Sequence, residues 1–420
     1  MTISRAEASG TASPSPRTAA RRARRSGGPV RPDGSARPVF LLALAVLATI
    51  SPFATDMYLP AFTQITAEFE VTAPAVQLTL TSFLIGVAAG QLVFGPLSDR
   101  FGRKPPLLVG TAVCVAASAV AALAPSVEVL VGARLVQGFA GAAGIVIGRA
   151  IVADLFQGAE AARIFSLLAV LGGIGPIAAP LFGGFLAGPI GWRGVLGVLC
   201  ALTVGMLLVA VFLVKEPPRM ETPAGAPRAK GLGILRNRHF AAHGLIKMFG
   251  YMVLMGYIAA SPFIFQNMIG VGPLGSGLLF ALNSVGLISA NSLNARLVRR
   301  FGPRRMLFCG LCVLTAAAVL LGVLVAAALP AYLLPVPLVL LVGSMGLIFG
   351  NAVALAMQHA RGAAGTGSAF IGFSQFIGGA AVAPLVGLAG ESSALPLAAV
   401  VLAGCAATWV CFMAGRPATH

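Results

Sequence analysis

The sequence predicts an all-α membrane protein with twelve transmembrane helices in two pseudo-symmetric halves of six. Three observations predict this fold class: 58% of the 420 residues are hydrophobic, only 10% are charged, and the apolar residues form long runs. Soluble domains carry about a quarter charged residues, so this composition excludes a soluble globule. The mean hydropathy of +0.92 agrees with that exclusion.

A helix that crosses a bilayer needs about 20 mainly apolar residues. On that basis we expect spans at residues 38–61, 76–98, 105–124, 128–152, 163–187, 193–214, 241–266, 274–297, 304–329, 332–357, 366–390 and 393–415. Residues 1–37 are rich in Ser, Pro, Ala, Gly and Arg and hold too little apolar surface to fold alone. We interpret them as a disordered basic tail rather than a secretion signal, because the following apolar run is too long and lacks a cleavage site.

The loops between these runs predict the orientation. Every second loop carries cations, starting with the loop around residues 99–104, whereas the others hold few cations and the acids Glu68, Glu70, Glu128 and Glu391. Cytoplasmic loops are enriched in Lys and Arg, so we expect both termini in the cytoplasm. The net charge of +17 is spread over the tail and these loops. That distribution sets topology and argues against a nucleic-acid-binding groove.

Residues 215–240 form the longest internal polar stretch and contain four prolines, which is typical of a linker. They separate two six-helix bundles at residues 38–214 and 241–416. An internal repeat supports this division, because Arg100-Phe101-Gly102 recurs as Arg300-Phe301-Gly302. The second copy is degenerate: Asp99 corresponds to Arg299. Paired halves of this kind are a known plan of membrane transporters.

Two motifs resemble those of the major facilitator superfamily. Gly95-x-x-x-Asp99-Arg100-x-Gly102-Arg103-Lys104 resembles the signature loop of the superfamily. Arg134-x-x-Gln137-Gly138 is similar to the fourth-helix motif of its proton-coupled members. The resemblance covers residues 38 to about 415 and implies the major facilitator fold.

The fifth predicted helix resembles the antiporter motif of drug exporters. The matching residues are Gly172, Gly175, Pro176, Gly183 and Gly184, whereas Ala179-Pro180 stands where many exporters carry a glycine pair. Small residues let transmembrane helices pack closely. Tight packing here is expected to block a proton leak between the halves.

Three further stretches, Thr55–Pro60, Ser261–Gln266 and Asn351–Gly367, resemble the Bcr/CflA subfamily. Its members are bacterial drug–proton antiporters of the bicyclomycin and chloramphenicol resistance type. The resemblance implies export of a small lipophilic compound in exchange for protons by alternating access, without a cofactor.

Ionisable residues inside a span are functional candidates by default. Asp56 and Arg134 fall at similar depth in the outer half of their helices, at 1.5 Å per residue. We expect Asp56 to take up and release the transported proton and Arg134 to adjust that equilibrium. The alternative is a static structural ion pair.

The basic loop is expected to act as a cytoplasmic gate. Its glycines permit close backbone approach, and its carboxylate can lie against a helix N-terminus, which the superfamily pattern implies is the eleventh helix at residues 365–368. The predicted gate residues are Gly95, Asp99, Arg100, Gly102, Arg103, Lys104 and Arg149. The alternative is a loop that only sets topology.

A cavity for lipophilic compounds needs aromatic side chains and a few polar groups. The candidates in the predicted spans are Tyr58, Tyr251, Tyr257, Gln266, Asn283, Asn351 and Gln375. The partners expected are a small-molecule drug or metabolite, protons and the lipid bilayer, with the chain acting as a monomer.

Other chemistry finds little support in the sequence. All six cysteines lie within apolar runs, where we expect small core residues rather than metal ligands. No phosphate-binding Walker loop occurs. The alternatives to drug export are a proton-coupled exporter of an endogenous metabolite or dipeptide, an uptake symporter, and a membrane enzyme or assembly scaffold.

Overall fold

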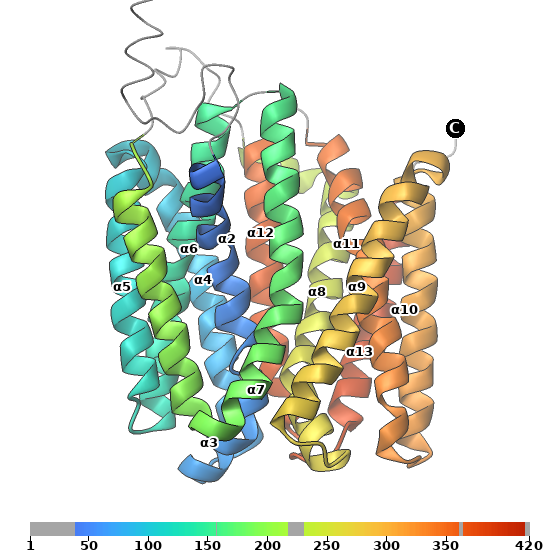
Figure 1. Ribbon diagram of the computed structural model, residues 1–420. Helices are drawn as coiled ribbons and strands as arrows, with labels where there is room; N and C mark the ends of the chain where they lie inside the picture. Colours follow the sequence, from blue (N-terminus) through green and yellow to red (C-terminus); the bar gives the residue numbers. More distant parts are fainter. Residues whose placement is uncertain (1–37, 157, 217–230, 361–363, 416–420) are drawn as a thin grey trace, which may run out of the picture.

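The computed structural model of the chain describes residues 38–156, 158–216, 231–360 and 364–415, and these residues form a bundle of long, roughly parallel helices (Figure 1). The first set contains α2 (Pro38–Asp56), the short α3 (Phe62–Phe69), α4 (Ala73–Phe101), α5 (Lys104–Ala122), α6 (Val127–Leu155) and α7 (Gly158–Phe212). The second set contains α8 (Arg238–Phe263), α9 (Pro273–Phe301), α10 (Pro303–Ala326), α11 (Pro335–Gln358), α12 (Ala364–Val382) and α13 (Leu395–Ala414).

Short irregular helices complete several of these elements. They are the 3₁₀ turns η1 (Leu59–Ala61), η2 (Gly231–Arg236), η4 (Ala331–Leu333) and η5 (Ala383–Gly387), and the π-helical turn η3 (Ile264–Met268). The turn η2 and the start of α8 fall inside the stretch predicted as a linker. The second set of helices therefore begins at Arg238, three residues before the predicted boundary.

Helix α7 is two helices joined at Gly191, whose φ of 65° and ψ of 179° break the helical path. A φ in this region is one that glycine adopts readily. Figure 1 shows the two green arms of α7 running in opposite directions from this point. They match the predicted spans at residues 163–187 and 193–214.

Ten helices of the described residues are long and apolar enough to cross a membrane. One of them, Gly175–Phe212, covers both arms of α7, and the 19-residue α2 stands outside the ten. The described helices are thus consistent with the twelve predicted spans. All regular elements in the described chain are helical, as the sequence predicted.

The helices pack mainly within their own set. In the first set, α4 and α5 lie on α6, while α2 and α5 lie on α7; in the second, α11, α12 and α13 surround α8. The two largest contacts between the sets are those of the first arm of α7 with α9 and of α4 with α12 and η5. Smaller contacts place η1 against α8 and α9, and α3 against α8.

Large apolar side chains remain exposed around the outside of the bundle, including Phe185 at 64% and Val109 at 63%. Such a surface is expected where lipid replaces water as the solvent. The same arrangement corrects the expectation that all cysteines are core residues. Cys309 and Cys312 are exposed on α10, so they lie on a side of this helix that the described residues leave uncovered.

Candidate functional site

Arg134 of α6 is completely buried inside the first set of helices. Its guanidinium donates hydrogen bonds to the Gln137 side-chain oxygen and to the Ala54 carbonyl oxygen, both at 2.6 Å. The guanidinium carbon also lies over the rings of Tyr58 and Phe83, at 4.2 and 4.4 Å from their centroids. Aromatic faces attract a cation, so these groups stabilise the buried charge.

Asp56 is the last residue of α2 and is 7% exposed. Arg134 bonds Ala54, two residues earlier, so the two residues predicted to act together lie at the same helix end. Within the described chain, the guanidinium bonds a backbone carbonyl and an amide rather than the Asp56 carboxyl. The last carbonyls of a helix lack intrahelical partners; Arg134 supplies one and fixes the end of α2.

Asp56 also faces the second set of helices. Its carboxyl lies within electrostatic range of the Tyr251 and Tyr257 hydroxyls of α8. A change in the charge of Asp56 therefore changes its electrostatic interactions with both sets of helices.

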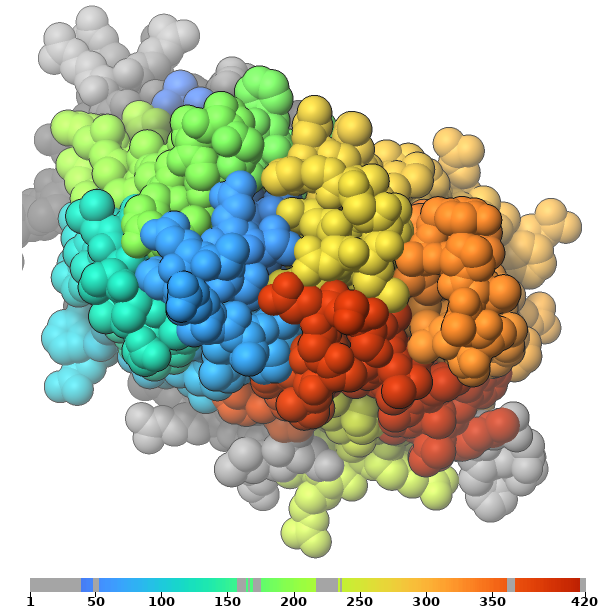
Figure 2. Space-filling model, turned by 90° about the horizontal axis from the view of Figure 1, so that it is seen from below, coloured from blue at the N-terminus to red at the C-terminus, as the bar shows by residue number. Residues whose placement is uncertain are grey.

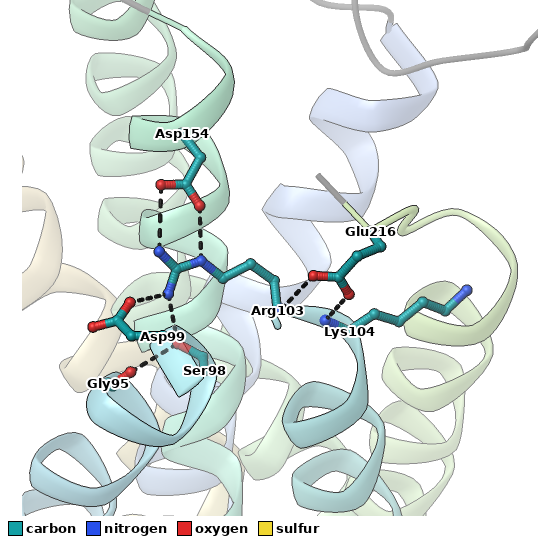
Figure 3. Close-up of polar contacts among 7 residues, drawn as sticks. All are labelled: Gly95, Ser98, Asp99, Arg103, Lys104, Asp154 and Glu216. Atoms are coloured by element: carbon teal, nitrogen blue, oxygen red, sulfur yellow. Dashed lines mark hydrogen bonds and ion pairs between the residues drawn. The ribbon is translucent and has the colours of Figure 1, made fainter. Parts of the chain in front are cut away.

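The basic loop between α4 and α5 is organised by Arg103 (Figure 3). Its guanidinium binds both oxygens of Asp154, at 2.7 and 3.3 Å, the Asp99 carboxylate at 2.5 Å and the Ser98 hydroxyl at 2.7 Å. Burial disfavours the charged guanidinium, but the hydrogen bonds to Asp154 and Asp99 outweigh it and raise the pKa of Arg103. This loop therefore holds a permanent cation between two carboxylates.

Glu216, four residues beyond the end of α7, completes this cluster. Its carboxylate accepts hydrogen bonds from the backbone N–H groups of Arg103 and Lys104, at 2.6 and 2.7 Å (Figure 3). Gly102, with φ of 92°, allows this approach, because a Cβ there would lie 2.7 Å from a Glu216 oxygen. Sequence reasoning missed Glu216, although it is an acid two residues after an apolar run.

The other predicted gate residues have different positions. Gly95 contributes its carbonyl oxygen to the Ser98 hydroxyl, at 2.9 Å. Arg100 lies over the Phe101 ring, at 5.3 Å from its centroid. Arg149, predicted as part of the gate, is exposed on α6, and Arg103 is the arginine that binds Asp99.

Gly183 and Gly184 of the predicted antiporter motif lie at close helix contacts. A Cβ at Gly184 would lie 2.5 Å from the Pro273 carbonyl oxygen and 3.3 Å from the Gly277 Cα atom of α9. A Cβ at Gly183 would collide with the carbonyl oxygen of Met57. Of the remaining motif residues, Gly172 and Gly175 lie in the same arm of α7, and Pro176 accepts a hydrogen bond from α9.

Tyr58, Tyr257 and Asn283 are candidates for substrate contact that are buried and already paired. The Tyr58 hydroxyl is hydrogen-bonded to the Thr79 hydroxyl at 3.0 Å. The Asn283 amide donates to the Tyr257 hydroxyl at 2.7 Å. These side chains are fixed within the protein in this conformation.

The other candidates differ in exposure. Tyr251 of α8 and Gln375 of α12 are half-buried, and the Tyr251 ring packs edge-on against Phe376, with 5.6 Å between the ring centroids. Asn351 of α11 is buried and its amide donates to the Asn294 side chain at 2.7 Å. Near Tyr251, the Lys247 ammonium lies 3.4 Å from the centroid of the Phe349 ring.

Hydrogen bonds join the two sets of helices from the middle of the bundle to the end opposite the basic loop. The joined groups are Thr63 and the Gln266 side chain, Gln266 and the Pro60 carbonyl, Gln77 and the Ala259 carbonyl, Thr81 and the Ala380 carbonyl, and Ser284 and the Pro176 carbonyl. Seen from that end, the blue segment around α3, the yellow start of α9 and the red connection between α12 and α13 meet side by side (Figure 2). This end of the interface is closed.

Comparison with known proteins identifies the family. The sequence profile of the Major Facilitator Superfamily matches residues 44–383. An uncharacterized MFS-type transporter of Bacillus subtilis, YdgK, is 32% identical over 88% of this chain and 93% of its own length. A bicyclomycin resistance protein homolog of Haemophilus influenzae is 30% identical over 86% of this chain and 91% of its own length.

Two further similarities agree with this match. A chloramphenicol resistance protein of Pseudomonas aeruginosa is 32% identical over 67% of this chain and 68% of its own length. The crystal structure of a bacterial homolog of the human lysosomal transporter Spinster, inward-facing and unoccupied, has a TM-score of 0.71 at 16% identity, covering 91% of this chain and 98% of that one. The chain therefore belongs to the major facilitator superfamily of membrane transporters.

Proposed function

We propose that this transporter expels a small lipophilic drug in exchange for protons by alternating access. The relatives named for bicyclomycin and chloramphenicol resistance support the drug class. Because the family consists of transporters, the protein is not an enzyme. It is a multi-pass membrane protein, and the alternation of basic and acidic loops supports a bacterial plasma-membrane location with both termini in the cytoplasm.

The buried carboxyl of Asp56 is the observation on which proton coupling depends. It lies at the end of α2, beside the Arg134 contact and facing the tyrosines of α8. Burying a charge is costly, so a change in its surroundings between two conformations changes its proton occupancy. The fixed end of α2 then passes that change to α6 through Arg134.

Alternating access requires that one end of the interface is closed while the other opens. The hydrogen bonds between the helix sets support an inward-facing conformation, closed at the outer end. In that conformation, Arg103 bonds the basic loop to its own set. When the inner end closes, this loop binds the start of α12. The substrate passes between the two sets of one monomer, near Tyr251, Asn351 and Gln375.

The test compares wild type with Asp56→Asn in a bacterial host that lacks its own drug exporters. The panel contains phenicols, bicyclomycin, fluoroquinolones, tetracyclines and lipophilic cations. We expect wild type to protect against at least one class, and this protection to be lost with Asp56→Asn or with a protonophore. Glu70→Gln removes an exposed carboxylate and is the matched control that keeps protection.

Two outcomes contradict the proposal. Asp56→Asn with full proton-coupled export would exclude Asp56 as the proton carrier. No protection by wild-type protein that is present in the membrane would contradict drug export. Transport of an endogenous metabolite or dipeptide by the same protein would then be the function to measure.

A further inference from the structure

A shallow depression of about 360 Å³ lies between α10 and α13, at the end of the bundle that carries the basic loops. Its lining residues are Arg304, Arg305, Phe308 and Phe412. Helix α10 packs on α9, α11 and α13 within its own set and stands at the edge of the bundle (Figure 1). The depression therefore faces the surrounding membrane rather than the interface between the two sets.

Aromatic rings form the floor of this depression. The Trp409 ring packs edge-on against Phe308 and Phe412, with centroids 5.6 and 5.8 Å apart. The indole N–H of Trp409 donates to the Thr315 hydroxyl at 2.8 Å, which fixes the cluster. Phe308 is 46% exposed. A rigid apolar surface thus lies directly below the two arginines.

Within the described part of the second set, no carboxylate side chain lies at this end to neutralise the arginines. Five arginines lie between residues 296 and 305, and the only carboxylate side chain after Glu221 is Glu391, in the connection between α12 and α13. Glu391 lies at the opposite end of the bundle, where it accepts a hydrogen bond from Asn267. The equivalent loop of the first set differs, because Arg103 binds two carboxylates there.

Among the described residues, Arg304 has an aromatic contact and no ion pair. Its guanidinium carbon lies 5.3 Å from the centroid of the Phe412 ring, while Arg305 is exposed beside it. A guanidinium matches the geometry of a phosphate through paired N–H donors. Two such groups above an aromatic floor suit a ligand with an anionic head and an apolar tail.

We propose that this depression binds an anionic phospholipid, with its phosphate on Arg304 and Arg305 and an acyl chain along Phe308. Basic pockets on the cytoplasmic side of membrane proteins bind anionic lipid headgroups, because the negatively charged inner leaflet attracts Lys and Arg side chains. In the orientation proposed above, the lipid comes from the inner leaflet. This site is separate from the route of the transported compound.

The test is native mass spectrometry of the purified full-length protein, titrated with phosphatidylglycerol or with phosphatidylcholine of the same chains. We expect phosphatidylglycerol to bind more tightly by about thirtyfold, from two arginines near the membrane surface. Arg304→Gln with Arg305→Gln should abolish this preference. Arg304→Lys with Arg305→Lys keeps the charge and should retain most of it.

The matched control is Arg236→Gln with Arg238→Gln, which removes the same charge from exposed positions at the same end. This control should keep the preference for phosphatidylglycerol. Equal binding of the two lipids, or an equal loss in the control, would overturn the proposal. Full displacement of the lipid by millimolar inorganic phosphate would also overturn it, because the site would then recognise a free anion.

Discussion

The contact between Gly184 of α7 and the start of α9 should control how firmly the outer end closes. In Gly184→Ala, the new Cβ would lie 2.5 Å from the Pro273 carbonyl oxygen. Ordinary contacts begin near 3.4 Å, so the two helices must separate by roughly 1 Å or distort. Overpacking of this size costs about 1–3 kcal/mol. If the strain is confined to the closed form, the closed-to-open ratio falls by roughly 5- to 150-fold.

Accessibility from outside the cell measures this ratio. Thr63→Cys, introduced at the closed end in a cysteine-free background, supplies a thiol for a membrane-impermeant maleimide. We expect Gly184→Ala to accelerate labelling of this thiol. Gly188→Ala is the control on the same arm, because a Cβ there meets no atom within 4 Å. Equal labelling in the two alanine variants would refute the reasoning.

Two further predictions concern charges outside the spans. The Arg193 guanidinium and the Trp192 indole hold the pKa of Glu68 below its usual value of 4.5. Their stabilisation of the folded protein is therefore present above about pH 4.5 and is lost as the pH falls through the lower folded-state pKa. Glu68→Gln should remove this acid-dependent change in melting temperature, which corresponds to at most about 1 kcal/mol for an exposed pair. Glu216→Gln weakens the hydrogen bonds that cap the start of α5 and should destabilise the protein by about 0.5–2 kcal/mol. Its melting temperature should be lower than that of the control Glu70→Gln. Equal melting temperatures of the two variants would contradict the capping role.

The sequence predicted the helices well because each span is a long apolar run bounded by charged loops. The repeat of Arg100-Phe101-Gly102 also extends to local geometry, since Arg100 and Arg300 lie 5.3 and 5.4 Å from the ring centroids of Phe101 and Phe301. The close approach predicted for the glycines of α7 is present at Gly184. These features depend on residues close together in the sequence or on single helix faces.

The partners of buried polar groups could not be predicted in the same way. Arg134 bonds the carbonyl of Ala54. Every residue has a backbone carbonyl, so the residue type does not identify which one accepts the bond. The choice of Arg103 over Arg149 as the partner of Asp99 depends on the turn between α4 and α5, which aims one side chain between two carboxylates. Such pairings follow from three-dimensional placement and require the folded structure.

The chemistry of the closed end suits an interface that must open in every cycle. The five hydrogen bonds that join the helix sets among the described residues are all between neutral groups. Each contributes about 0.5–1.5 kcal/mol net, because water replaces the partner when the bond opens. Their sum is roughly 3–8 kcal/mol, comparable to the 5.5 kcal/mol that reverses a 99:1 ratio of two states. One proton moving down 100 mV supplies about 2.3 kcal/mol, so proton and substrate binding together can reverse the equilibrium between the two conformations. A buried ion pair at the same place would resist opening far more strongly, since breaking one leaves uncompensated charge.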